Sequence, residues 1–159
     1  MMKVRSAELT RIGEGYLAVT SSGTEARFGA STDGALSPMD TLLASLGACT
    51  AMDVHAIATK KRQRIDRYVV RVRGEQRDEH PRIYTRIDVT HEVHGSNLDL
   101  EAIRRSIELS AARYCPVNAM LSAGATEVHH GYLVSVTGVA PAEWQGEVLV
   151  TGPFARPRG

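Results

Sequence analysis

Aromatic side chains and net charge are both scarce in this sequence. Aromatic residues make up 5% of the 159 residues, and 19 Lys and Arg nearly balance 18 Asp and Glu, for a net charge of +1. Proteins that bind nucleic acids usually present a basic patch, and those that bind single strands also present stacking aromatic rings. The composition therefore predicts no nucleic-acid partner.

Long uninterrupted apolar runs are also missing. The longest apolar-rich stretch, residues 41–58, contains Asp53 and His55, which makes it a poor membrane span. The first ten residues, MMKVRSAELT, lack the apolar segment of a secretory signal. We therefore expect a cytoplasmic protein with no membrane partner.

Cysteine occurs only twice, at Cys49 and Cys115, and not in a CxxC motif. Two cysteines are too few for the disulfide framework of a small secreted domain. In a reducing compartment both thiols stay reduced, and a disulfide between them would be transient and catalytic or redox-sensing. The alternative is that both are inert core residues, because a free cysteine often packs as a small hydrophobic side chain.

Hydrophobic periodicity predicts an α+β fold with antiparallel sheets. Strand patterns occupy residues 3–9, 15–20 and 25–29, a long helix residues 40–62, and two further strands residues 68–76 and 83–93. A second helix is expected over residues 99–114, a short third helix over 116–123 and a last strand over 126–136. Strands and helices that are grouped in this way, and do not alternate, favour α+β over a doubly wound fold.

The long helix carries apolar residues around most of its circumference, which is typical of a helix buried on all sides. One small sheet and one amphipathic helix cannot cover it, so we expect a homodimer. We divide the chain into a domain of residues 1–137 and a C-terminal extension, 138–159, which contains three prolines and one short strand pattern, GEVLV.

Local physical chemistry predicts that Cys115 is the more acidic thiol. Cys115 directly precedes Pro116 and is expected at the N-terminal edge of the short third helix, where the helix dipole and free N–H groups favour a thiolate. Asp53, one helical turn after Cys49, would disfavour a thiolate at Cys49.

Two stretches carry a family resemblance, LSPMDTLLASLGACTAMDV around Cys49 and LSAARYCPVNAML around Cys115. From about residue 27 to residue 136 the sequence resembles the family of osmotically inducible protein C and organic hydroperoxide reductase, and most of all the branch with a Ser-Pro-Met-acidic helix start. The resemblance implies an intertwined α+β homodimer around central long helices. It also implies a cysteine-based peroxidase that needs no cofactor and no metal.

By this resemblance, Cys49 attacks a small hydroperoxide and becomes a sulfenic acid, and Cys115 resolves it as a disulfide. An external dithiol, such as a lipoyl protein, would reduce the disulfide. This order of reaction is opposite to the one that the helix dipole predicts.

The resemblance also implies an Arg–Glu pair that clamps the reactive sulfur, and here the sequence departs from the pattern. The family's Glu directly follows the Pro of the long helix, where this chain has Met39, with Asp40 one residue later. One residue on a helix turns a side chain by about 100°. The matching arginine would be Arg11, in the turn between the first two strands. We take Arg11 and Asp40 as candidate catalytic residues.

Histidines offer weaker candidates. His91 and His94, three apart on a strand, face opposite sides and cannot easily share a metal ion, and the adjacent His129 and His130 have the same difficulty. His55 could move protons near Cys49, although a core or interface position is more usual. The departure at Met39 leaves a second hypothesis open, a non-catalytic dimeric binding or redox-sensing protein on the same fold.

Overall fold

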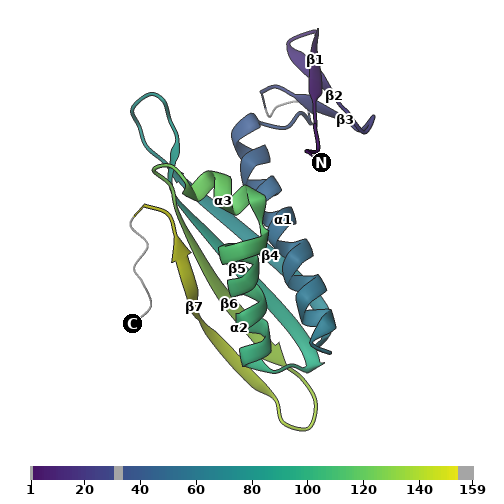
Figure 1. Cartoon of the computed structure of the whole chain (residues 1–159), viewed down its shortest axis with the longest axis vertical. Coiled ribbons are helices and arrows are strands. Elements are labelled where there is room, and N and C mark those ends of the chain that lie inside the picture. Colours follow the sequence, from purple (N-terminus) through teal and green to yellow (C-terminus); the bar gives the residue numbers. More distant parts are fainter. Residues whose placement is uncertain (1, 31–33, 154–159) are drawn as a thin grey trace. The chain divides into compact units, whose positions relative to one another are not determined.

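The computed structural model describes residues 2–30 and 34–153. The chain forms two compact units, residues 1–42 and residues 43–159, and each is described on its own. Figure 1 labels the helices and strands of both units.

The N-terminal unit contains a three-stranded antiparallel sheet in the order β1-β2-β3. Its strands are β1 (Ala7–Ile12), β2 (Gly15–Thr20) and β3 (Glu25–Phe28). The β1–β2 turn contains Gly13 at φ 58°, a backbone conformation that glycine adopts without steric cost. The three predicted strands are confirmed, although the first begins at Ala7, not at Lys3.

The larger unit is built on a four-stranded sheet in the order β4-β5-β6-β7. These strands are β4 (Arg64–Gln76), β5 (Tyr84–Asn97), β6 (Glu127–Val136) and β7 (Ala142–Thr151). The outer pairs are antiparallel, but β5 and β6 are parallel. The prediction of purely antiparallel sheets is therefore wrong, because the helical segment between β5 and β6 forms a crossover connection that parallel strands require.

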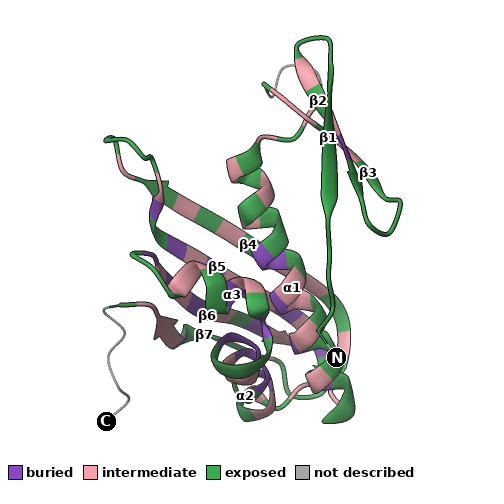
Figure 2. Ribbon diagram, turned by 45° about the horizontal axis from the view of Figure 1, so that its top comes forward, coloured by how far each residue is buried: buried purple, intermediate pink, exposed green. Residues whose placement is uncertain are grey.

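The helices of this unit lie on one face of the sheet (Figures 1 and 2). They are α1 (Pro38–Lys60), whose first residues belong to the N-terminal unit, α2 (Leu100–Leu109) and α3 (Pro116–Ser122). Asp99 caps α2 by accepting a hydrogen bond from the N–H of Glu101. The expected helix of residues 99–114 is not uniform, because its last turn, η2 (Ser110–Tyr114), is a π-helix.

The alternation of buried and less buried residues along β5 shows which face of the sheet packs against the core. Its inward positions are buried and its outward positions are not, as the sequence pattern predicts. The inward side chains pack against the helices and against β6 and β7. The main cluster of buried apolar residues comprises Val54, Ala58, Val93, Ile103, Ile107, Val134 and Val148.

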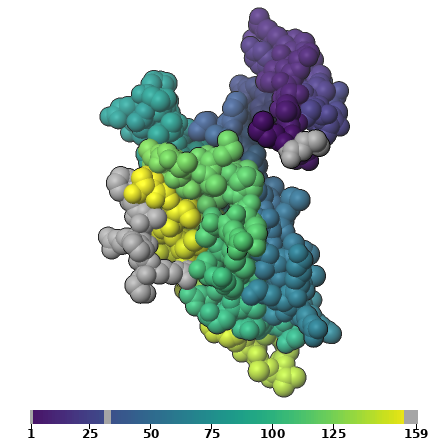
Figure 3. Space-filling view, viewed as in Figure 1, coloured from purple at the N-terminus to yellow at the C-terminus, as the bar shows by residue number. Residues whose placement is uncertain are grey.

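β7 lies beyond the boundary predicted after residue 137 and pairs with the sheet of the larger unit, and the boundary itself stays a prediction. β7 pairs with β6 from Val136↔Ala142 to Val128↔Thr151, and Val148 belongs to the core. Figure 3 shows β7, in yellow, beside the green helical segment of α2 and α3. The predicted strand GEVLV is thus the second half of the ten-residue edge strand β7, which completes the sheet.

The long helix is only partly covered within one chain. Five residues of α1 are buried, namely Leu46, Gly47, Thr50, Val54 and Ala58. Met52, by contrast, is 74% exposed. Partial cover by one chain agrees with the sequence expectation, and cover of the remaining apolar surface by a second chain stays a prediction. By length and composition alone, α1 is also apolar enough to cross a membrane, a test that core helices of water-soluble proteins pass as well.

Candidate functional site

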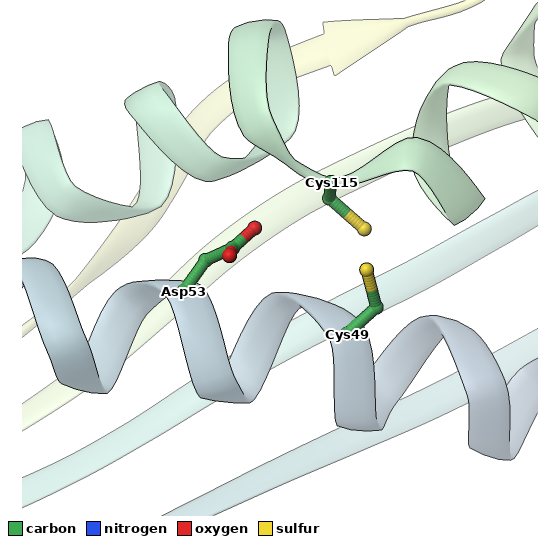
Figure 4. Close-up of side chains that lie close together, drawn as sticks. All are labelled: Cys49, Asp53 and Cys115. Carbon is green, nitrogen blue, oxygen red and sulfur yellow. The ribbon is translucent and has the colours of Figure 1, made fainter. Parts of the chain in front are cut away.

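The two cysteines, 66 positions apart in the sequence, meet in the larger unit. The sulfurs of Cys49 and Cys115 and a carboxylate oxygen of Asp53 all lie within 4.8 Å of one another. Figure 4 shows the two sulfurs pointing toward each other and Asp53 on the same side of α1 as Cys49. Both cysteines are free thiols.

Two elements build this cluster. Cys49 and Asp53 are four residues apart on α1, so their side chains project from one helical face. Cys115 is the N-cap residue of α3, with extended backbone, directly after the π-helical turn. Its N–H donates to the carbonyl of Ser110, five residues back, at 2.8 Å. A π-turn is often found at functional sites, and here it ends at the cysteine.

The environment of Cys115 disfavours its thiolate. Cys115 is 2% exposed, and burial, together with a hydrogen-bonding interaction with Cys49, raises the pKa of its thiol to about 12. The N–H of Asn118 donates to Cys115 Sγ at 3.4 Å and lowers the pKa only in part. The N-cap position is confirmed, but the prediction that it makes Cys115 acidic is wrong, because desolvation outweighs the N–H groups of a seven-residue helix.

Asp53 accepts a hydrogen bond from a buried hydroxyl group. The hydroxyl of Ser110 donates to Asp53 Oδ2 at 3.1 Å, and Thr50 Oγ1 lies 3.0 Å from the same hydroxyl oxygen. Ser110 and Thr50 are both fully buried. Among the ion pairs formed by residues 2–30 and 34–153, none involves Asp53.

A chain of buried polar groups runs from Cys115 into the sheet. Asn118 Oδ1 lies 2.9 Å from His130 Nε2, and the rings of His130 and His91 stack with centroids 5.9 Å apart. Tyr68 Oη lies 2.7 Å from His91 Nδ1. Burial lowers the pKa of His91 to about 3 and of His130 to about 4, and it raises the pKa of Tyr68, so all three are neutral near pH 7.

Sequence reasoning missed this polar chain. It compared His91 with His94 and His129 with His130, each pair within one strand, whereas the contact joins His91 on β5 to His130 on β6. A signal was present, because His91 is in phase with the inward-facing Val89 and Val93. Thr50, Ser110 and Asn118 were also missed, since small polar residues on helices give no distinctive pattern.

The two other predicted catalytic residues, Arg11 and Asp40, lie in the N-terminal unit. Arg11 is exposed on β1 opposite Tyr16, not in the turn where it was expected. Asp40 is exposed in the first turn of α1, where its backbone N–H donates to Ser37 Oγ at 3.5 Å. Cys49 and Cys115 belong to the other unit, so the roles of Arg11 and Asp40 stay predictions. His55 is exposed on α1.

The fold and the paired thiols define a class of protein. The family model for OsmC-like protein matches residues 31–130, which include both cysteines. The chain belongs to the OsmC-like family.

The chain is also similar to individual proteins and solved structures. Protein YhfA of Escherichia coli K12 is 40% identical over 106 residues, which cover 67% of this chain and 78% of YhfA. A crystal structure of a hypothetical protein from Aquifex aeolicus superimposes with a TM-score of 0.76 at 30% identity, covering 86% of this chain and 100% of that one. An organic hydroperoxide resistance protein from Elizabethkingia anophelis superimposes with a TM-score of 0.65 at 14% identity, covering 86% and 99%, which shows the shared fold alone.

Proposed function

We propose that this protein is a thiol-dependent peroxidase that reduces organic hydroperoxides or hydrogen peroxide, with Cys49 as the peroxidatic and Cys115 as the resolving cysteine. The observation that carries the proposal is the approach of the two sulfurs, which face each other within 4.8 Å. A disulfide needs an S–S distance of about 2.05 Å, so the two sulfurs approach further by side-chain rotation before the bond forms. The family also includes relatives described as organic hydroperoxide resistance proteins.

The reaction balances with two thiols and one hydroperoxide. The Cys49 thiolate attacks the distal oxygen, the O–O bond breaks, and the alkoxide takes a proton and leaves as alcohol. The sulfur of Cys115 then attacks the Cys49 sulfenic acid, water leaves, and the disulfide forms. An external dithiol restores both thiols by exchange and is itself oxidised to a disulfide.

Differences between the two thiols support this order. Cys49 is partly exposed on α1 and can meet a substrate, whereas Cys115 is 2% exposed and its pKa is raised to about 12. The thiolate is the nucleophile, so a buried thiol with a raised pKa suits the second, intramolecular step better than the first. This argument and the family resemblance favour the same assignment.

A homodimer completes the proposal, since exposed apolar residues on α1, such as Met52, would gain cover from a second copy. We further propose a cytoplasmic protein whose disulfide is reduced by an external dithiol, possible donors being lipoyl proteins. A redox sensor on the same fold is the second candidate. The observation that favours it is the carboxylate of Asp53 within 4.8 Å of both sulfurs, a third group for which the peroxidase reaction has no role.

The test is steady-state consumption of an organic hydroperoxide with dihydrolipoamide or dithiothreitol as reductant. Repeated turnover that is lost in Cys49→Ser is the expected result, and Ser45→Ala, one turn earlier on the exposed surface of α1, is the control that should stay active. Oxidation to the disulfide without turnover in the presence of reductant would favour the sensor. Absence of any thiol oxidation at modest peroxide would refute both candidates.

A further inference from the structure

The peroxidase chemistry uses two members of the cluster and leaves the third unexplained. Asp53 has a carboxylate oxygen within 4.8 Å of both sulfurs, and neither step of the peroxidase reaction uses it. None of the ion pairs within residues 2–30 and 34–153 neutralises it. Two thiols and a carboxylate that converge in this way form a site suited to a cation.

We propose that Cys49, Asp53 and Cys115 form a zinc-binding site in the reduced protein. This site goes beyond the peroxidase proposal and does not depend on it. The same three side chains are the only group of three or more His, Cys, Asp or Glu residues within the described ranges whose ligand atoms converge closely enough to hold one metal ion.

The geometry fits a tetrahedral ion with little rearrangement. Zn–S bonds of about 2.3 Å and Zn–O bonds of about 2.1 Å place tetrahedral ligand atoms about 3.6–3.8 Å apart. The three atoms start within 4.8 Å of one another, so a contraction of at most about 1.2 Å brings each pair to the tetrahedral separation. Cys49 and Asp53 share one face of α1, so their backbones already stand in fixed positions beside each other. Changes of side-chain torsion are then enough to bring the ligand atoms together.

The chemical types of the three ligands indicate which metal ion the site would bind. Two thiolates are soft ligands that favour zinc over magnesium or calcium, which prefer shells made only of oxygen. Zinc replaces the two thiol protons, so the high pKa of a free thiol does not prevent binding. Three protein ligands leave the fourth position to water or an external ligand, as in zinc sites that stay open to solvent.

The side chains of Ser110 and Thr50 fix the orientation of the Asp53 carboxylate, as outer hydrogen bonds do for metal ligands. Ser110 donates to Asp53 Oδ2 and leaves Oδ1 without a hydrogen bond from that hydroxyl. Thr50 in turn contacts Ser110, so the carboxylate is oriented by two fully buried side chains. Such outer partners commonly change metal affinity by about 10–100-fold when removed.

The site would respond to oxidation. Two zinc-bound thiolates, one hydroperoxide and two protons give the disulfide, one alcohol, one water and free Zn²⁺, so oxidation removes two of the three ligands. Bound zinc, conversely, holds both sulfurs and withholds them from peroxide. Zinc occupancy and disulfide formation therefore exclude each other.

The experiment titrates the reduced, metal-free, tag-free full chain with Zn²⁺ against a chromophoric chelator, in a phosphine reductant and without peroxide. One Zn²⁺ per chain is expected, weakened at least about 10-fold in Asp53→Asn and in Ser110→Ala. Asp66→Asn, an exposed carboxylate on β4, is the matched control and should bind like the parent. Equal affinity in Asp53→Asn and Asp66→Asn, or no saturable binding, would overturn the site.

A second measurement identifies the ligands without relying on variants. Co²⁺ in the same protein should give the intense visible bands of a tetrahedral ion and a thiolate charge-transfer band, and X-ray absorption of the zinc form should show two sulfur neighbours. A shell of oxygen and nitrogen only, or zinc retained after oxidation to the disulfide, would contradict the proposal. These readouts involve no peroxide turnover, so they stand or fall separately from the peroxidase.

Discussion

Asn118 holds His130 in one tautomer. The amide Nδ2 of Asn118 donates to the carbonyl of Ala111 at 2.8 Å, so its Oδ1 faces His130 Nε2 and accepts from it at 2.9 Å. The backbone N–H of the same asparagine donates to Cys115 Sγ. Asn118 thus joins the resolving-cysteine segment to the sheet.

Replacing Asn118 by alanine should destabilise the protein by about 2–4 kcal/mol, because the carbonyl of Ala111 and the imidazole of His130 would both be buried without this partner. Urea unfolding followed by circular dichroism measures the loss. Asn97→Ala, at the exposed end of β5, is the control and should change the free energy of unfolding by less than about 0.5 kcal/mol. A similar small effect at Asn118 would contradict the bridging role.

The buried histidines should make the protein lose stability in mild acid. Burial depresses their folded-state pKa values to about 3 for His91 and about 4 for His130, below the unfolded value of about 6.5. As pH falls below about 6.5 the unfolded chain takes up protons that the folded chain does not, so stability present above that pH is lost toward the folded pKa values. Between pH 7 and pH 5 each histidine should account for about 2 kcal/mol.

Urea unfolding at several pH values checks this slope. His130→Gln retains a donor toward Asn118 and should remove about half of the histidine-dependent loss, whereas His80→Gln, at an exposed position, should leave it unchanged. A ¹⁵N spectrum that shows His91 or His130 protonated in the folded protein at pH 6 would refute the depressed pKa values.

The sequence predicted most elements because their patterns are local. The alternation of Ile87, Val89 and Val93 predicts β5 and its inward face, and the apolar pattern of residues 40–62 predicts α1 to within two residues at each end. The parallel pairing of β5 with β6 could not be predicted in the same way, since it depends on where the crossover returns the chain. The role of β7 was underestimated because flanking prolines suggested a loop.

The site was predicted in part for a similar reason. The family motifs imply Cys49 and Cys115 as a pair, and the structure brings their sulfurs together. The acidity of Cys115 was mispredicted because a sequence shows the N-cap but not the burial that opposes it. Asp53 was noted for its spacing from Cys49, whereas Ser110, which orients it, comes from a distant segment.

The C-terminal strand should prove to be part of the core. Val148→Ala removes two buried methyl groups from the main cluster and should cost about 1.5–2.5 kcal/mol. Val139→Ala, in the exposed β6–β7 turn, is the matched control and should be neutral within about 0.5 kcal/mol. Thermal unfolding of both variants measures the difference in stability. Equal melting temperatures would support the alternative that residues 138–159 are a dispensable extension.

The proposed homodimer predicts that a charge at Met52 weakens association. Met52 is 74% exposed in the single chain, and a glutamate there would be tolerated by the monomer but costly when desolvated at an interface. Sedimentation equilibrium should show a dimer for the parent and a shift toward monomer for Met52→Glu. Met120→Glu, equally exposed on α3, is the control. A folded parent monomer at micromolar concentration would contradict the dimer.

The two thiols should give opposite products when each is studied alone. Cys115→Ser leaves the partly exposed Cys49 able to react once, so brief peroxide exposure should trap it as a sulfenic acid and excess peroxide should carry it to sulfinic acid. Cys49→Ser leaves only the buried thiol whose pKa is raised to about 12, so it should remain a thiol under the same exposure. Mass spectrometry with a sulfenic-acid probe compares the two variants. A label on Cys115 in Cys49→Ser would exchange the two roles, and no label on either variant would favour a non-catalytic protein. The expected label on Cys49 alone follows from burial, because the thiol that faces Asn118 can reach a sulfur already oxidised beside it but has little access to a peroxide in solvent.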